Sequence, residues 1–312
     1  MNSTERYINE NKKVLNQKYQ HTYYFGIPKK AYPCTISGIV KKYIKCTVKG
    51  IYNYISEVVK HPREYLEISK YRNIKLNKSS LIIASGPSQG YLSVDYLNRI
   101  QQRGCETYVI NYWSENHALK LHIPNYLVLS DPKTFNNEVD RNKEKNLRLI
   151  SYLKDNPKII ILCPLKMKKI IIDNGLKNTI QCFVNSELCS LNFINPMLPR
   201  GYLSLTAYKA LAWSIFQNYK IIGVIGLDNT YLKNIFCDKK NKLYINEIHA
   251  GYDDYLVDVS TQYHDFESFL SEYRMIFNNI KYFVGHNVVN LDQFSILDTF
   301  PKVKLSKFID EI

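Results

Sequence analysis

Three short segments of the chain combine glycines, hydroxyls and charges in patterns that could bind the phosphate of a nucleotide. The first is Ser85-Gly86-Pro87-Ser88-Gln89-Gly90, which directly follows the apolar run Leu81 to Ala84. Glycines allow backbone N–H groups to approach an anion, and the hydroxyls of Ser85 and Ser88 add donors for a phosphate or a ribose. The loop matches neither a Walker A nor a GxGxxG pattern, and an ordinary strand-to-helix turn would use the same residues.

The second segment, Pro199 to Thr206, leads into a long apolar stretch with helical periodicity. The N-terminus of a helix attracts anions because its dipole is positive there. Arg200 could therefore pair with a phosphate, while Ser204 or Thr206 could donate a hydrogen bond to it. An ordinary helix N-cap would account for the same residues.

The third segment is the apolar run Ile221 to Ile225, which is followed at once by Gly226, Asp228 and Asn229. In α/β proteins, ligands bind beyond the carboxyl ends of the parallel strands. We therefore expect Asp228 to face a ligand, although the same carboxylate could instead cap the next loop.

The elements that must position these segments form an alternating pattern from Ser79 onward. Apolar, β-rich runs predict strands at 81–84, 107–110, 126–129, 159–163, 180–183 and 221–225. Helical periodicity predicts helices at 94–103, 137–153, 203–217 and 266–278, the first of them closed by Gly104. This alternation predicts an α/β domain over residues 79–312, with a mostly parallel sheet flanked by helices.

The first 78 residues differ from this body in their charge. Residues 1–80 hold 16 Lys and Arg against 5 Asp and Glu, whereas the whole chain carries a net charge of +14. Residues 34–60 predict an amphipathic helix, with an apolar stripe on one side and lysines on the other. Such a helix suits an anionic membrane surface, where each basic residue contributes about 1 kcal/mol, but a helix packed on a domain with a solvated lysine face shows the same pattern. We expect His61-Pro62 to end it and residues 65–78 to form a connector.

Composition excludes several classes of protein. Apolar residues make up 45% of the chain, enough for a large core, and no run approaches the roughly 18 apolar residues of a membrane-spanning helix. The N-terminus does not resemble a signal peptide, and the seven cysteines show no CxxC spacing. A cytoplasmic protein, peripheral to the inner face of the cell membrane, is the expectation from these features.

Taken in this order, the three segments resemble bacterial sialyltransferases of glycosyltransferase family 42 and the related motility-associated-factor proteins that glycosylate flagellin. The loop Ser85 to Ser88 is similar to the nucleotide loop of that family, and Val109-Ile110-Asn111-Tyr112 to its strand that ends in a donor-contacting Asn. Ser130-Asp131-Pro132 stands where the family has Asn-Pro or Asp-Pro. The resemblance extends to Tyr219-Lys220 with the following Gly226-x-Asp228, and to the C-terminal segment 285–303.

The resemblance implies a Rossmann-like nucleotide-sugar-binding domain, a variant of the GT-A type, that covers residues 79–312. It further implies transfer of a sialic or other nonulosonic acid from a CMP-activated donor to a bacterial surface glycan, with inversion and without a metal or other cofactor. The chain contains no Asp-x-Asp pair, the usual metal-binding motif of metal-dependent glycosyltransferases. Tyr231, Tyr244 and Tyr252 are candidates to stabilise the departing CMP.

Direct displacement also needs a base that takes the proton from the acceptor hydroxyl, and imidazole has a suitable pKa. By resemblance, His249 or His264 holds this role, with His249 favoured and Asp253 or Asp254 available to orient it. Either histidine could instead be an ordinary surface residue.

Two departures from the family concern the donor and the leader. Ala84 and Ser85 replace a Gly and an Asn that are common in the family, so the identity of the donor sugar stays open. The basic residues 1–78, here called the leader, have no counterpart in the compact enzymes of the family. The leader could hold the enzyme near a lipid-linked glycan.

The alternatives to a glycosyltransferase are a pterin-type pyrophosphokinase, for which the required carboxylate cluster is missing, and a basic nucleic-acid-binding protein, for which no known motif occurs.

Overall fold

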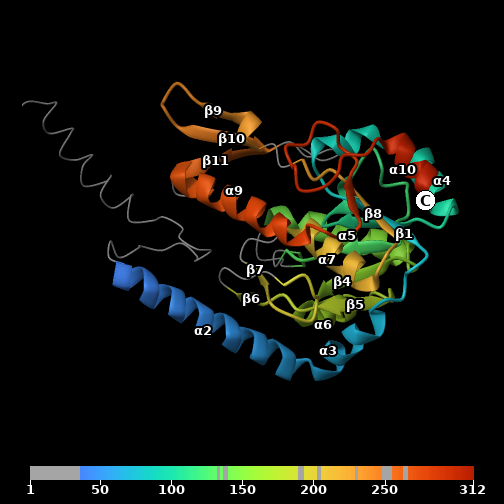
Figure 1. Ribbon diagram of the computed structural model, residues 1–312, viewed down its shortest axis with the longest axis horizontal. Helices are drawn as coiled ribbons and strands as arrows, with labels where there is room; N and C mark the ends of the chain where they lie inside the picture. The colour runs from blue at the N-terminus through green and yellow to red at the C-terminus, as the bar shows by residue number, and fades with distance from the viewer. Residues whose placement is uncertain are drawn as a thin grey trace, which may run out of the picture.

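The computed structural model describes residues 36–131, 134–135, 140–188, 193–201, 205–228, 231–247, 255–262 and 266–312. Its centre is a seven-stranded sheet in which every pair of neighbouring strands is parallel (Figure 1). In spatial order the strands are β12 (Val288–Asn290), β8 (Ile221–Ile225), β1 (Ser79–Ile83), β2 (Glu106–Ile110), β3 (Tyr126–Val128), β4 (Ile160–Pro164) and β5 (Ile180–Phe183).

The strands are buried because most of their residues are apolar and helices cover the sheet. All five residues of β1 and of β2 are buried. Helix α7 (Thr206–Gln217) packs across β1, β2, β3 and β8, which explains why ten of its twelve residues are buried. The other helices of the body are α4 (Val94–Gln102), α5 (Asp140–Asp155), α6 (Lys168–Asp173) and α10 (Leu305–Glu311).

The chain changes direction in the sheet between β1 and β8. From β1 it steps outward through β2, β3, β4 and β5, and α7 then returns it to β8 on the other side of β1. From β1 the chain therefore continues to β2 on one side, whereas from β8 it continues to β12 on the other side. In open parallel sheets such a switch point is where ligands bind.

The N-terminal helix α2 (Ile36–Lys60) lies along the outside of the body (Figure 1). Its only acidic residue, Glu57, accepts hydrogen bonds from the backbone N–H groups of Asn185 (3.1 Å) and Ser186 (2.9 Å). Gly50 is buried in this contact. A Cβ at position 50 would lie 2.6 Å from the carbonyl oxygen of Glu187, so the close approach requires glycine. A further helix, α3 (Pro62–Ile68), starts at the proline, packs against β5 and continues into a 3₁₀ turn (Ser69–Tyr71).

Two small sheets complete the described chain. One is antiparallel, in the order β11 (Tyr255–Asp258), β10 (Leu243–Glu247) and β9 (Ile235–Cys237). It packs with α8 (Val259–Gln262) and α9 (Phe266–Ile280) around a second core of Ile245, Val257, Val259, Phe269 and Tyr273. The other is the parallel pair β6 (Glu187–Leu188) and β7 (Arg200–Gly201).

The α/β class, the parallel sheet and the six strands expected from the sequence are confirmed, and the expected helices occur with ends shifted by up to a few residues. The expected helix at 34–60 is also present as α2. The expected end of the first helix at His61-Pro62 is confirmed, since α2 ends at Lys60. The prediction of a connector over residues 65–78 was wrong in its first part, because Pro62 takes the first position of a second helix, α3. Several elements were not predicted from the sequence: α3, α6, α8, α10, β12, the antiparallel sheet and the pair β6 and β7.

Candidate functional site

The candidate site lies at the carboxyl edge of the sheet, where the loops after β1 and β8 are bonded to each other. The N–H of Gly86 donates to the carbonyl of Gly226 (2.7 Å), and the N–H of Gly226 donates to Ser88 Oγ (2.8 Å). Ser88 in turn donates its N–H (2.7 Å) and its hydroxyl to the carboxylate of Asp228. Two of the three sequence segments therefore meet directly.

These bonds change how the first loop can act. The N–H groups of Gly86 and Ser88 are engaged within the protein, so they are not available to a phosphate in this arrangement. Ser88 and Gln89 are buried, whereas Ser85 and Gly86 are half-buried and Pro87 and Gly90 are exposed, so these four residues form the accessible part of the loop.

The close approach of the two loops explains their glycines. Gly226 has φ +76°, and a Cβ at this position would overlap the carbonyl oxygen of Ala84. A Cβ on Gly86 would lie 2.5 Å from both Asp228 Oδ2 and the Gly226 carbonyl oxygen. Both positions therefore require glycine for packing.

Asp228 is buried, with only 3% of its surface exposed. Burial, followed by a hydrogen bond with the carboxyl group of Asp292, raises its pKa to about 6, against the lowering effect of its bonds from Ser88. Asp292 follows β12 and is also buried, and its Oδ1 accepts the N–H of Phe294 at 2.8 Å. Asp228 thus binds the loop after β1 and pairs with a second carboxyl group. The loop that directly follows Asp228 begins at residues 229 and 230, outside the described residues, so the expectation that Asp228 caps it stays a prediction.

The next residue at this edge is Asn111, which directly follows β2 and has φ +52°. Its N–H donates to the carbonyl of Val128 in β3 (2.9 Å), whereas its buried side-chain oxygen finds no hydrogen-bond donor among the residues described. Gln89 and Asn116 join the loops after β1 and β2 through a hydrogen bond of 2.7 Å. The side-chain oxygen of Asn111 is therefore an available acceptor at the end of β2, where a hydrogen bond joins the following loop to the loop after β1.

The N-terminus of α7 lies beside the end of β3. The hydroxyls of Ser130 and Thr206, the first residue of the helix, are 2.6 Å apart. Leu205 stands at the N-cap position, and among the described residues no side chain caps α7. Asp131, half-buried, follows Ser130. The hydroxyl groups and the free end of the helix dipole form a setting that favours an anion.

Arg200 is bonded away from this helix end. Its guanidinium lies 2.5 Å from Glu187 and also donates to Asn185 Oδ1 (2.7 Å) and to the carbonyl of Gly201 (3.2 Å). A phosphate at Arg200 would compete with the carboxylate of Glu187. Nearby, burial and the charge of Arg200 hold the pKa of Lys209 well below its usual range.

Tyr244 lies in β10, where its ring stacks on Phe236 with 5.7 Å between the ring centroids. The other predicted site residues lie outside what the structure describes: Ser204, Asn229, His249, Tyr252, Asp253, Asp254 and His264. The backbone of Tyr231 starts a 3₁₀ turn, but its side chain is likewise outside. The base, His249 or His264, therefore stays a prediction.

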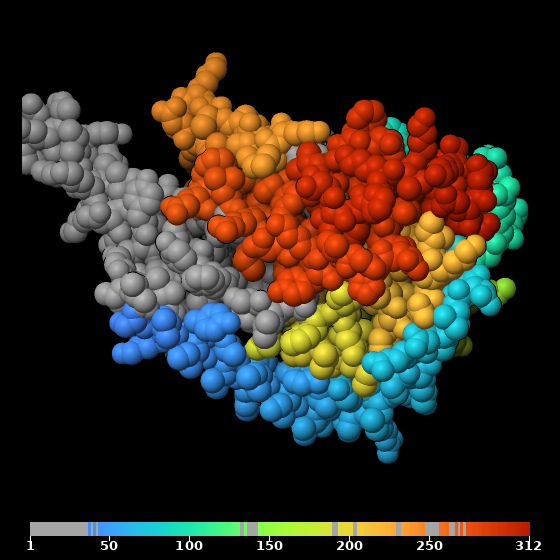
Figure 2. Space-filling model, viewed as in Figure 1, coloured from blue at the N-terminus to red at the C-terminus, as the bar shows by residue number. Residues whose placement is uncertain are grey.

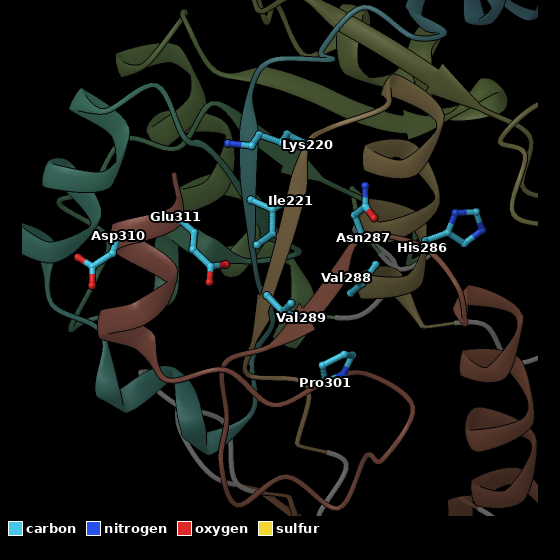
Figure 3. Close-up of a pocket in the computed structure, with 9 residues that line it drawn as sticks. All are labelled: Lys220, Ile221, His286, Asn287, Val288, Val289, Pro301, Asp310 and Glu311. Carbon is cyan, nitrogen blue, oxygen red and sulfur yellow. The ribbon is translucent and has the colours of Figure 1, made fainter.

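A separate open pocket of about 690 Å³ lies at the opposite, amino edge of the sheet (Figure 3). It is lined by Lys220, Ile221, His286, Asn287, Val288, Val289, Pro301, Asp310 and Glu311. The ring of His286 points away from Asp310 and Glu311, so these groups do not converge (Figure 3). In the described part of the chain, no three His, Cys, Asp or Glu side chains are grouped so that they could hold a metal ion.

Sequence reasoning missed Asp292, the Gln89–Asn116 bridge and the buried amine of Lys209. Asp292 could have been found, because Val288-Val289-Asn290-Leu291-Asp292 repeats the pattern of an apolar run that ends in Asp, as in Ile225 to Asp228. The bridge and Lys209 carry no local signal, since both depend on contacts between distant segments.

Comparison with known proteins identifies no relative of this chain. No protein-family model matches the chain, and no curated protein or solved structure is significantly similar to it.

Proposed function

We propose that this chain is a sialyltransferase-like glycosyltransferase, with a Rossmann-like domain of the GT-A-variant type. In this proposal it transfers a sialic or other nonulosonic acid from a CMP-activated donor to a bacterial surface glycan. The donor binds at the carboxyl edge of the sheet, and no metal takes part. The acceptor attacks with inversion, and His249 or His264 takes its proton.

The observation that carries the proposal is the position of β8 beside β1. This order brings the loop Ser85 to Ser88 and the loop Gly226 to Asp228 together at the switch point, the usual ligand position in open parallel sheets. The order and spacing of these segments are those on which the family resemblance rests.

The chemistry of the neighbouring groups supports a nucleoside monophosphate. The unpartnered oxygen of Asn111 suits a donor such as the exocyclic amine of cytosine or a ribose hydroxyl. Ser130 and Thr206, at the uncapped end of α7, suit the single phosphate. The two groups adjoin, because Asn111 bonds to Val128, two residues before Ser130.

A thermal-shift measurement with CMP, UMP, GDP and ATP tests the donor class. A ligand at ~100 times its Kd stabilises the native state by about 2.7 kcal/mol, so CMP should raise the melting temperature by several degrees. A larger shift with ATP would favour the pyrophosphokinase alternative, and binding to random DNA in preference to CMP would favour the nucleic-acid alternative.

Asn111→Gly makes this test specific for the site. Glycine keeps the positive φ but removes the acceptor oxygen, so the variant should fold and lose the CMP-induced shift. Asn241→Gly is the matched control, because Asn241 also has φ +58° and lies in the turn between β9 and β10. An unchanged CMP shift in Asn111→Gly would remove Asn111 from the donor site.

The catalytic base is tested by transfer assays with His249→Ala and His264→Ala. The variant that lacks the base should lose transfer and keep its CMP-induced thermal shift. Full transfer by both variants would refute a histidine base.

A further inference from the structure

The helix α2 presents three different faces along its length. One face docks on the body through Gly50, through Tyr54, whose hydroxyl donates to the Met197 carbonyl (3.2 Å), and through Glu57. A second face carries apolar side chains that recur every three or four residues and are all exposed: Val40, Ile44, Val48, Ile51, Ile55 and Val59. The third face carries lysines.

Most of this exposed row belongs to the apolar stripe expected from the sequence, so packing on the body does not explain that part of the stripe. Val48 is 61% exposed and Val59 is 69% exposed, although both are aliphatic. Tyr52, 69% exposed, widens the row. Figure 2 shows α2, in blue, along the outer side of the molecule. A continuous apolar row of this kind on a surface marks an interaction site.

The charges of α2 identify the partner. The exposed side chains of Lys41, Lys45 and Lys49 follow the border of the apolar row in helical spacing. Glu57, the only carboxylate of the helix, is turned inward and bonded to Asn185 and Ser186. The outer surface of α2 is thus apolar and cationic, without a negative charge that an anionic surface would repel.

We propose that α2 lies in the interface of an anionic lipid bilayer, with its row Val40 to Val59 in the acyl boundary and its lysines at the headgroups. Among the described residues no helix has the length and hydropathy needed to cross a bilayer. An in-plane helix needs neither, because it buries only one face. The proposed binding of α2 to a membrane does not rest on the proposed function. If both hold, the glycan acceptor is expected to be held at a membrane as well.

Flotation of the full-length chain with lipid vesicles tests the proposal. The chain should bind phosphatidylcholine vesicles that contain phosphatidylserine, and should bind pure phosphatidylcholine far more weakly. The triple variant Ile44→Gln, Val48→Gln, Ile55→Gln keeps good helix formers and should weaken partitioning by about 100-fold. Replacing Lys41, Lys45 and Lys49 with Gln should cost about 5-fold for each lysine, and added salt should reduce that difference.

A matched control separates this face from general surface hydrophobicity. Leu121, Ile123 and Leu147 are also exposed aliphatic residues but lie outside α2, so their replacement with Gln should leave vesicle binding unchanged. An equal loss in the control, or full binding by both α2 variants at unchanged melting temperature, would overturn the proposal. A dimer in sedimentation velocity that the Ile44 triple variant converts to a monomer would also overturn it, because a second copy would then cover the face.

Discussion

The carboxyl pair at the ends of β8 and β12 makes the stability of the protein depend on pH. Burial and the hydrogen bond with Asp292 raise the pKa of Asp228 from 3.8 to about 6 in the folded state. The folded state therefore holds this proton more tightly than the unfolded state does. The contribution of Asp228 to stability falls as pH rises from about 4 to about 6, and its full cost, of order 3 kcal/mol, is present above pH 6.

Asp292→Asn isolates the part of this cost that the second carboxyl group causes. The Asn side-chain oxygen can keep the hydrogen bond from the N–H of Phe294, while its amide group faces Asp228 as a donor. Because burial is the larger cause of the shift, we expect the variant to gain about 1 kcal/mol of unfolding free energy at pH 7 and almost nothing near pH 4.

Urea denaturation across this pH range measures the effect, with Asp310→Asn as a control at an exposed carboxylate. The difference between Asp292→Asn and the parent protein should grow from pH 4 to pH 6 and then stay constant. A constant difference across the range, or a less stable variant at pH 7, would contradict the paired-carboxyl account.

Three other substitutions test buried positions of the α/β body, each by chemical or thermal unfolding. Lys209→Met should stabilise the protein by about 1–3 kcal/mol near neutral pH and remove a rise in stability towards alkaline pH, because the buried amine has a lowered pKa. Tyr219→Phe should cost about 1–2 kcal/mol, since its buried hydroxyl donates to Glu106; equal stability would show that this bond contributes nothing. Gly226→Ala should cost at least about 2 kcal/mol, because the new methyl group meets the Ala84 carbonyl at a positive φ, and a neutral effect would mean that the two loops can move apart.

Much of the fold could be predicted from the sequence because fully buried strands appear as short apolar runs. Runs such as Ile180 to Phe183 and Ile221 to Ile225 occur in the structure with the same ends. The strand β12 has only three residues, and its burial depends on pairing with β8, so its short apolar run did not by itself predict a strand. The region after Pro62 was misjudged because a proline that ends one helix is also a good first residue for the next.

The candidate site was predictable in its position and less so in its bonding. Parallel strands bring their carboxyl ends to one edge, which is enough to place Asn111, Asp131 and Asp228 at the same edge from the sequence. The bonds of Ser88 and Gly86 are set by the register between β1 and β8, which a single sequence does not encode locally. The expected outward role of Asp228 did not anticipate that its carboxylate turns back to Ser88.

The place of β8 between β1 and β12 also has a consequence for biosynthesis. During translation, β1 can pair with β2 soon after both leave the ribosome, but its other edge needs residues 221–225, synthesised some 140 residues later. Until then a bare apolar strand edge is open to pairing with other chains. Expression at reduced temperature, or with chaperones that shield nascent chains, should therefore improve the yield of native protein more than any change of the finished surface.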